Sequence, residues 1–224
     1  MVVNLLRSDV VSLTGLCILA IMFINISCVT KKPFSGIVHY ELSYTSNMPE
    51  ILSSDSLTKL YGKSKIFYIQ DSFYKYEMNG NLAPFSIYDP SNQIIYNKSR
   101  DTDTVYYFDA TKKSRDSILS FSLSKKSDVI NGILCDKLVL QSKYSNTTYY
   151  FNTKYSIDPS NFENHSYDNW YYYLTISKSL PLKVSYKNSM YSYTMTFTRM
   201  KHELIEKKYF YIDTNSILIK GLIY

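Results

Sequence analysis

Short segments of alternating apolar and polar residues, separated by turn residues, recur along most of this chain and constrain its fold more than any other feature. In residues 37–44, every second side chain is apolar and the side chains between them are polar, as in a β-strand with one buried face. The apolar set is Val38, Tyr40, Leu42 and Tyr44. Turn signals spaced about eight to twelve residues apart favour a sandwich, a barrel or a half-open barrel.

From residue 65 onward the pattern is that of successive hairpins. The pair Asn79-Gly80 is the strongest turn signal of the first group, because both residues tolerate the positive φ of a tight hairpin. A second group of strands follows Asn131-Gly132. We expect the strands of this second group at residues 133–140, 147–152, 170–176, 182–186, 190–200 and 208–212.

Two segments have other patterns. Apolar residues in 49–60 indicate a short helix that opens near residues 53–55. Residues 110–126 are rich in serine and lysine and fit a helix, a strand or a covering loop.

The longest expected strand, residues 190–200, has one bulky apolar face and one hydroxylated face. This pattern predicts a sheet with one side on a core and the other toward water or a partner. If the sheet encloses a cavity, the apolar face supplies its ligand-lining residues, whereas a completely filled core is the competing interpretation. The candidate lining residues are Tyr191, Tyr193, Met195 and Phe197.

The N-terminal residues have the order of an export signal. Arg7 and Asp9 precede an apolar run, residues 10–26, which is short for a bilayer span and is followed by Ser27-Cys28. A small residue before a cysteine resembles the lipobox of bacterial lipoproteins, although Asn25 stands where that pattern prefers an aliphatic residue. The resemblance implies a signal peptide over residues 1–27, acylation of Cys28, a tether over residues 28–33 and one domain over residues 34–224.

The charge pattern and the cysteine content limit the classes of binding partner and the number of disulfide bonds that we expect. The formal net charge is +6, but the lysines are scattered singly or in pairs, which is typical of a solvated surface, and we expect no nucleic-acid partner. Of the three cysteines, only Cys135 would remain free after export and acylation, so the mature fold has no disulfide to rely on. The fold must therefore be stabilised by its hydrophobic core.

No sequence motif of a known catalytic or metal site is present. His39, His165 and His202 lie more than thirty residues apart, which excludes paired metal-ligand spacing, and we expect no metal, no cofactor and no catalysis. Cys135, His165 and Asp168 are the residue types of a nucleophilic set. Because Cys135 lies in an alternating strand, an unreactive buried thiol is the favoured interpretation.

Several short motifs together resemble a group of uncharacterised bacterial envelope lipoproteins with the half-barrel fold of the LolA and LolB lipoprotein carriers. The motifs are Cys28, residues 34–40 (FSGIVHY), residues 130–137 (INGILCDK), residues 149–151 (YYF) and residues 180–183 (LPLK). The resemblance implies a mainly β fold with a single antiparallel, strongly curved sheet, either a half-barrel or an open barrel, and one or two short helical segments. A β-sandwich is the alternative.

The loop from Pro159 to Trp170 combines aromatic side chains with amide and acid groups. Such a loop can stack on a sugar ring or lie at a cavity mouth, although its aromatic residues can equally pin a long loop onto the sheet. The candidate rim residues are Phe162, Tyr167 and Trp170.

These observations favour a lipid-anchored envelope protein, periplasmic or at the outer membrane, that binds or carries an apolar or amphipathic ligand. In the lipoprotein carriers that the chain resembles, the cavity holds acyl chains. The alternative is a structural or interaction lipoprotein that binds another envelope protein or a glycan.

Overall fold

In the computed structural model, which describes residues 32–82, 84–98, 103–213 and 215–221, one twelve-stranded sheet dominates the chain from Pro33 onward. The strands are β1 (Gly36–Ser46), β2 (Ser64–Gln70), β3 (Phe73–Met78), β4 (Phe85–Asp89), β5 (Ile94–Lys98), β6 (Thr104–Asp109), β7 (Ile118–Ile130), β8 (Ile133–Ser142), β9 (Ser145–Ser156), β10 (Ser179–Asn188), β11 (Tyr191–His202) and β12 (Ile217–Lys220). The described helices are α2 (Ser54–Tyr61), α3 (Trp170–Ser177) and the 3-10 helices η1 (Pro159–Phe162), η2 (Tyr167–Asn169) and η3 (Lys207–Phe210).

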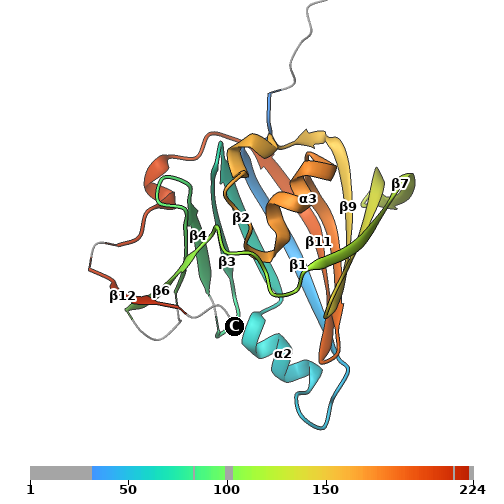
Figure 1. The fold of residues 1–224 in the computed structure, drawn as a ribbon, viewed down its shortest axis with the longest axis horizontal. Coiled ribbons are helices and arrows are strands. Elements are labelled where there is room, and N and C mark those ends of the chain that lie inside the picture. The colour runs from blue at the N-terminus through green and yellow to red at the C-terminus, as the bar shows by residue number, and fades with distance from the viewer. Residues whose placement is uncertain (1–31, 83, 99–102, 214, 222–224) are drawn as a thin grey trace, which may run out of the picture. The chain divides into compact units, whose positions relative to one another are not determined.

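The sheet is open, because its end strands, β12 and β7, are not paired with each other. The strand order is β12-β6-β5-β4-β3-β2-β1-β11-β10-β9-β8-β7, and Figure 1 shows the sheet curving around α3. All neighbouring strands pair antiparallel except β12 and β6, which pair in parallel. The expected fold class, a mainly β protein with one curved open sheet and short helices, is confirmed. The expectation of a wholly antiparallel sheet needs this one correction, because β12 was not predicted.

Helix α2 begins where the sequence indicates. Ser53 is the N-cap of α2, and its side-chain oxygen accepts a hydrogen bond from the Ser56 backbone N–H. Capping of this kind supplies a partner to one of the otherwise unpaired N–H groups of the first turn.

The expected strand over residues 170–176 is wrong, because this segment forms α3. Its aromatic and β-branched residues favour a strand locally. The buried side chains are Tyr173, Leu174 and Ser177, however, and this spacing belongs to one face of a helix. Figure 1 shows α3 lying across the concave face of the sheet, where that buried face has a surface to pack against. Tertiary packing therefore overrides local propensity here.

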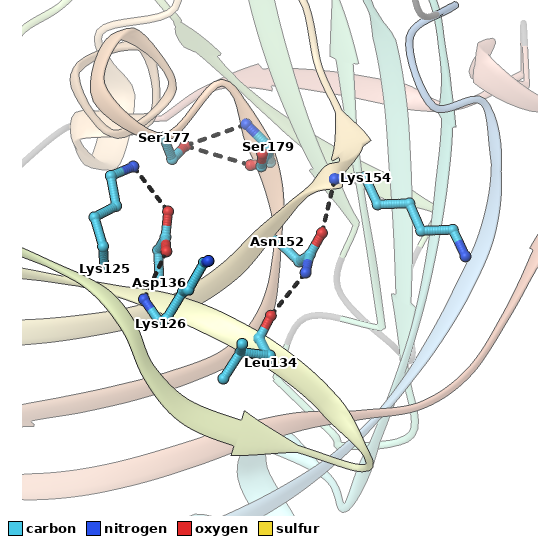
Figure 2. Close-up of polar contacts among 8 residues, drawn as sticks. All are labelled: Lys125, Lys126, Leu134, Asp136, Asn152, Lys154, Ser177 and Ser179. Atoms are coloured by element: carbon cyan, nitrogen blue, oxygen red, sulfur yellow. Dashed lines mark hydrogen bonds and ion pairs between the residues drawn. The ribbon is translucent and has the colours of Figure 1, made fainter.

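The C-terminal end of α3 is closed by two serines and a tyrosine. The Tyr173 hydroxyl donates to the Ser179 backbone oxygen over 2.9 Å, and Ser177 and Ser179 contact each other across the turn (Figure 2). The turn needs the left-handed conformation of Lys178, with φ 49°. These bonds lead the chain from α3 directly into β10.

The expected strand over residues 208–212 is also wrong. Residues 207–210 form η3, and Phe210 is buried against Ile87 and Ile205. Ile87 and its neighbour Tyr88 point to opposite faces of β4, so η3 covers the face of the sheet opposite to α3. The short helix η3, rather than another strand, therefore buries the apolar side chains on this face. The undecided segment over residues 110–126 contains the start of β7.

The two Asn-Gly pairs behave differently. Asn131 and Gly132 have φ values of 46° and 80° and form the tight β7–β8 turn that such pairs favour. Asn79 instead uses its side-chain oxygen to accept hydrogen bonds from the backbone N–H groups of Lys63, at 2.8 Å, and Ser64, at 3.0 Å. A Cβ at Gly80 would lie 2.2 Å from the carbonyl carbon of Tyr61. Asn79-Gly80 therefore connects a wider loop to the end of α2 and does not form a tight hairpin turn.

A bulge in β7 is held by one aspartate on β8. Asp136 accepts from Lys125 Nζ over 2.8 Å and from the Lys126 backbone N–H over 2.9 Å, as Figure 2 shows. Lys126 has φ 49°, and the strand pairing shifts register between Ser124 and Asp128. In the same region, the Asn152 side chain on β9 bonds to the Leu134 carbonyl oxygen and to the Lys154 N–H (Figure 2).

Most of the buried apolar residues form one cluster between the concave face of the sheet and α3. Its largest fully buried members are Tyr88, Tyr173, Phe151 and Phe162. Cys135 belongs to this cluster and is a free, fully buried cysteine. Among the residues that the structure describes, none of the helices has the length and hydropathy that crossing a bilayer requires. The expected signal peptide and Cys28 lie outside the described residues.

Candidate functional site

A cavity of about 370 Å³ lies on the concave side of the sheet. This volume is at the lower end of the range of about 300 to 1,000 Å³ that is typical of small-molecule sites. Strands β1 to β5 and β9 to β11 line it, together with the last residue of α2 and the segment over residues 165–170. Eight tyrosines contribute to the wall: Tyr44, Tyr61, Tyr74, Tyr76, Tyr149, Tyr167, Tyr191 and Tyr193.

Part of the wall is apolar because three neighbouring strands present apolar residues at matched positions. Met195 on β11 is paired with Val184 on β10 and with Leu42 on β1. All three residues line the cavity. We call this row the apolar strip, and it offers a surface on which an alkyl chain or a ring face can be buried.

A second part of the wall is polar and comes from strands β3 to β5. Tyr76 is paired with Ser86, and Ser86 with Asn97, so their side chains share one face of the sheet. The Asn97 side-chain oxygen is buried and has no hydrogen-bond partner in the part of the chain that the structure describes. Lys65 on β2 joins this group, with Nζ 4.0 Å from the centroid of the Tyr76 ring. We call these four residues the polar wall.

The segment over residues 159–177 covers the cavity and is anchored by aromatic packing. Phe162 is fully buried and stacks against Tyr74 and Tyr88. Trp170 packs edge-on against Phe162, with ring centroids 6.2 Å apart, and stacks on Tyr173 at 5.5 Å. The Trp170 Nε1 donor nevertheless has no hydrogen-bond partner among the described residues. This segment therefore presents a rigid aromatic surface with one unused donor.

His165 ties the covering segment to the sheet. Its Nε2 lies 2.8 Å from the Tyr74 hydroxyl oxygen. Burial lowers the pKa of His165 to about 4, so the ring is neutral near pH 7. A neutral ring can accept the tyrosine proton at Nε2, which makes this a structural hydrogen bond.

Asp168 is the most unusual group in the cavity. Its backbone has φ 50°, a left-handed conformation that is rare for residues other than glycine. Its carboxylate has no hydrogen bond and no ion pair with any described residue, yet its side chain can be reached from the cavity. Burial raises its pKa to about 6, against the opposing effect of Lys65. A carboxylate with a raised pKa in a cavity makes Asp168 a candidate functional residue.

Lys65 faces the same space. Burial lowers the pKa of its ammonium group to about 8, and the Asp168 charge acts in the opposite direction. The two side chains do not approach within the distance of an ion pair. Both side chains line the cavity.

The predicted lining residues are distributed between cavity and core. Tyr191, Tyr193 and Met195 lie in the cavity wall, whereas Phe197 is buried in the packed core and does not line it. Of the predicted rim residues, Tyr167 and Trp170 line the cavity and Phe162 is core. A role for any of them in binding stays a prediction.

Sequence reasoning missed the polar wall. Lys65 lies two positions before Phe67 on β2, so the two side chains share the inward face of the strand. This alternation was the signal in the sequence that could have identified Lys65. Ser86 and Asn97 could not be found in this way, because only the strand register places them together.

The residue types of a nucleophilic set are not brought together. His165 and Asp168 line the cavity, but Cys135 does not. The Cys135 thiol donates to the Ile133 carbonyl oxygen, and burial raises its pKa. Within the described residues, no group of three or more histidine, cysteine or acidic side chains is arranged to hold a metal ion.

A scan of protein-family models and a search of curated proteins give no match. Solved structures with similar folds include PNGF-II in two crystal forms, at 9% and 10% identity, with TM-scores of 0.47 and 0.42. The similarity covers 84% and 82% of this chain but 32% and 31% of PNGF-II, so this chain spans about a third of that protein.

Two further similar structures come from mycobacteria. LprF of Mycobacterium bovis has 10% identity and a TM-score of 0.34, over 76% of this chain and 88% of LprF. The lipoprotein LppX of Mycobacterium tuberculosis has 13% identity and a TM-score of 0.34, over 77% of this chain and 89% of LppX. With all four TM-scores below 0.5, inferences about function rest on the cavity itself.

Proposed function

We propose that this protein is a lipid-anchored envelope protein that binds an amphipathic ligand in the cavity. The observation that carries the proposal is the cavity wall, which combines the apolar strip with buried polar atoms that have no hydrogen-bond partner among the described residues. A completely filled core would leave neither open space nor unpaired polar atoms, because burying such atoms without partners costs free energy.

The cavity volume limits the size of the ligand. About 370 Å³ suits one small molecule, or the head and first part of a longer one, rather than several acyl chains. A ligand that buries about 200 Å² of apolar surface gains roughly 5 kcal/mol, before the cost of its own immobilisation. We therefore expect modest affinity that depends on both parts of the wall.

The test is saturable binding of a hydrophobic fluorescent probe to the protein and to Met195→Gln. Met195 lies in the apolar strip, so the variant should bind the probe more weakly. Met190→Gln is the matched control, because Met190 is exposed and does not line the cavity. Thermal unfolding is measured on the same samples, since an unpaired buried amide also costs about 1–3 kcal/mol of stability.

Probe binding that saturates in the wild type and weakens only in Met195→Gln supports the proposal. A large fall in melting temperature for Met195→Gln, with no saturable binding by the wild type, rejects it.

The alternative function is an interaction protein that binds another envelope protein or a glycan. One observation favours it: β7 is an end strand of the sheet with an exposed apolar row, Leu119, Phe121 and Leu123. On this alternative, the wild type binds no probe in the cavity.

The anchoring proposal concerns residues outside the described part of the chain. We propose that residues 1–27 are removed on export, that Cys28 is acylated and that residues 28–33 tether the domain over residues 34–224 to the periplasmic side of a membrane, including the outer membrane. Cys28→Ala should then lose incorporated radiolabelled fatty acid and leave the membrane fraction. Equal incorporation by both proteins would contradict this.

A further inference from the structure

The polar end of the cavity offers donors and acceptors that the protein itself does not use. The Asn97 side-chain oxygen is buried without a hydrogen-bond partner among the described residues, and the carboxylate of Asp168, an exposed residue, lines the same cavity. The Trp170 Nε1 donor is buried without a partner among the described residues, and the Lys65 ammonium, also a donor, lies over the Tyr76 ring. A ligand that satisfies all four must therefore both donate and accept.

Tyrosine hydroxyls surround this centre. Tyr149, Tyr167 and Tyr193 line the cavity, and none of their hydroxyls has a hydrogen-bond partner among the described residues. The charge of Asp168 raises the pKa of each of these three tyrosines, after the larger effect of burial. The three hydroxyls and the carboxylate thus belong to residues that line the same cavity.

A charged head group fits this end of the cavity poorly. An anion attracted by Lys65 would meet the Asp168 carboxylate, and a cation attracted by Asp168 would meet Lys65. An aromatic cage would ordinarily favour a ligand cation. Here the protein's own cation already lies over the Tyr76 ring, at 4.0 Å. The geometry favours a head group without net charge.

We propose that the cavity recognises an amphiphile with a neutral, polyhydroxylated head group, such as one sugar ring, bound between Asp168 and Lys65. Its apolar part lies on the apolar strip of Leu42, Val184 and Met195. Each hydroxyl group both donates and accepts, so several of them together can satisfy the carboxylate, the ammonium and the unpaired tyrosine hydroxyls. Trp170 and the tyrosine rings provide flat apolar faces with polar edges for such a ring. This inference rests on the proposed function.

The experiment compares three probes with the same eight-carbon tail: octyl β-glucoside, octyltrimethylammonium and octanoate. Each is titrated below its critical micelle concentration as a competitor of the hydrophobic fluorescent probe. We expect octyl β-glucoside to bind at least about tenfold more tightly than either charged probe. Methyl β-glucoside, which lacks the tail, should bind more weakly than the octyl compound.

Asp168→Asn tests the head-group contact. The variant should bind octyl β-glucoside about tenfold more weakly than the wild type, because a neutral amide replaces a charged acceptor. Asp71→Asn is the matched control, since Asp71 has φ 54°, is exposed and does not line the cavity, and asparagine tolerates the same left-handed backbone. The control should leave octyl β-glucoside affinity unchanged.

Equal affinity for the three octyl compounds, or tighter binding of a charged one, overturns the neutral head group and leaves the proposed function standing. Methyl β-glucoside binding as tightly as the octyl compound overturns the placement of a tail on the apolar strip. If neither the fluorescent probe nor any octyl compound binds, both proposals fail.

Discussion

Two aspartates in this protein lie in or close to left-handed backbone but differ in their surroundings and partners. Asp136 lies beside a left-handed residue in the β7–β8 hairpin and accepts from Lys125 Nζ and the Lys126 N–H. Asp168 is itself left-handed, lines the cavity and has neither a hydrogen bond nor an ion pair with a described residue. The pKa of Asp136 is lowered by its two lysine neighbours in spite of its burial, whereas burial raises the pKa of Asp168 to about 6.

The difference separates a group that stabilises the fold from one that is available to a ligand. The backbone around Asp168 is nevertheless held firmly. The backbone N–H groups of Ser166 and Tyr167 donate to the Ala110 oxygen, and the Asn169 side chain donates to the Asp116 oxygen. The surrounding structure thus keeps the unpartnered carboxylate in place, which is how preorganised sites retain local strain.

The largest expected effect comes from removing the anchor of the covering segment. Phe162→Ala should destabilise the protein by about 3–5 kcal/mol, because a fully buried ring leaves a cavity among Tyr74, Tyr88 and Trp170. Phe121→Ala, at an exposed position of β7, is the matched control and should change stability by less than about 0.5 kcal/mol. Urea unfolding measures both. If Phe162→Ala also lost less than about 0.5 kcal/mol of stability, Phe162 would not be an anchor of the core, and the prediction that it lies at the cavity rim would be favoured.

A smaller loss is expected at the hairpin. Asp136→Ala should cost about 2 kcal/mol, because it removes two charge-assisted hydrogen bonds that hold the β7 bulge. Cys135 is paired with Asp128 in the same hairpin, so the reactivity of its thiol can be used to detect opening of the hairpin. A bulky thiol reagent should label Cys135 slowly in the wild type and faster in Asp136→Ala. Rapid labelling of the wild type would show that the thiol is not protected by burial.

The smallest expected effect is a gain in stability, whereas the two changes above cause losses. Asp168→Asn should raise stability at pH 7 by on the order of 1 kcal/mol, since burial penalises the charged carboxylate and water in the cavity offsets part of that cost. The folded-state pKa of about 6 lies above the ordinary value of 3.8, so the native protein binds this proton more tightly. The advantage of the variant should therefore shrink as the pH falls through 6 toward 4. Urea unfolding at pH 7, 5.5 and 4 tests this, and an advantage that grows at low pH contradicts it.

Much of the fold could be predicted because strand alternation is a local property. Residues 37–44 and 190–200 show their buried faces directly in the sequence, and both lie in strands of the sheet. The aromatic face of residues 191–195 likewise pointed toward the cavity side. Phe197 continues that alternation but lies in packed core, since alternation identifies a face and does not say where the packing along that face ends.

Other features were decided by contacts between distant residues. Residues 170–177 form a helix because the concave face of the sheet needs a cover, and β12 exists because β6 offers it a partner. The polar wall is brought together by strand register, and Asp168 reaches it from a segment about a hundred residues further along the chain. By itself, the sequence determined a β-rich chain in which several strands have one apolar face. Only the tertiary structure decided where that face leaves a cavity and which polar groups stay unpaired within it, because both depend on which strands and covering segments meet.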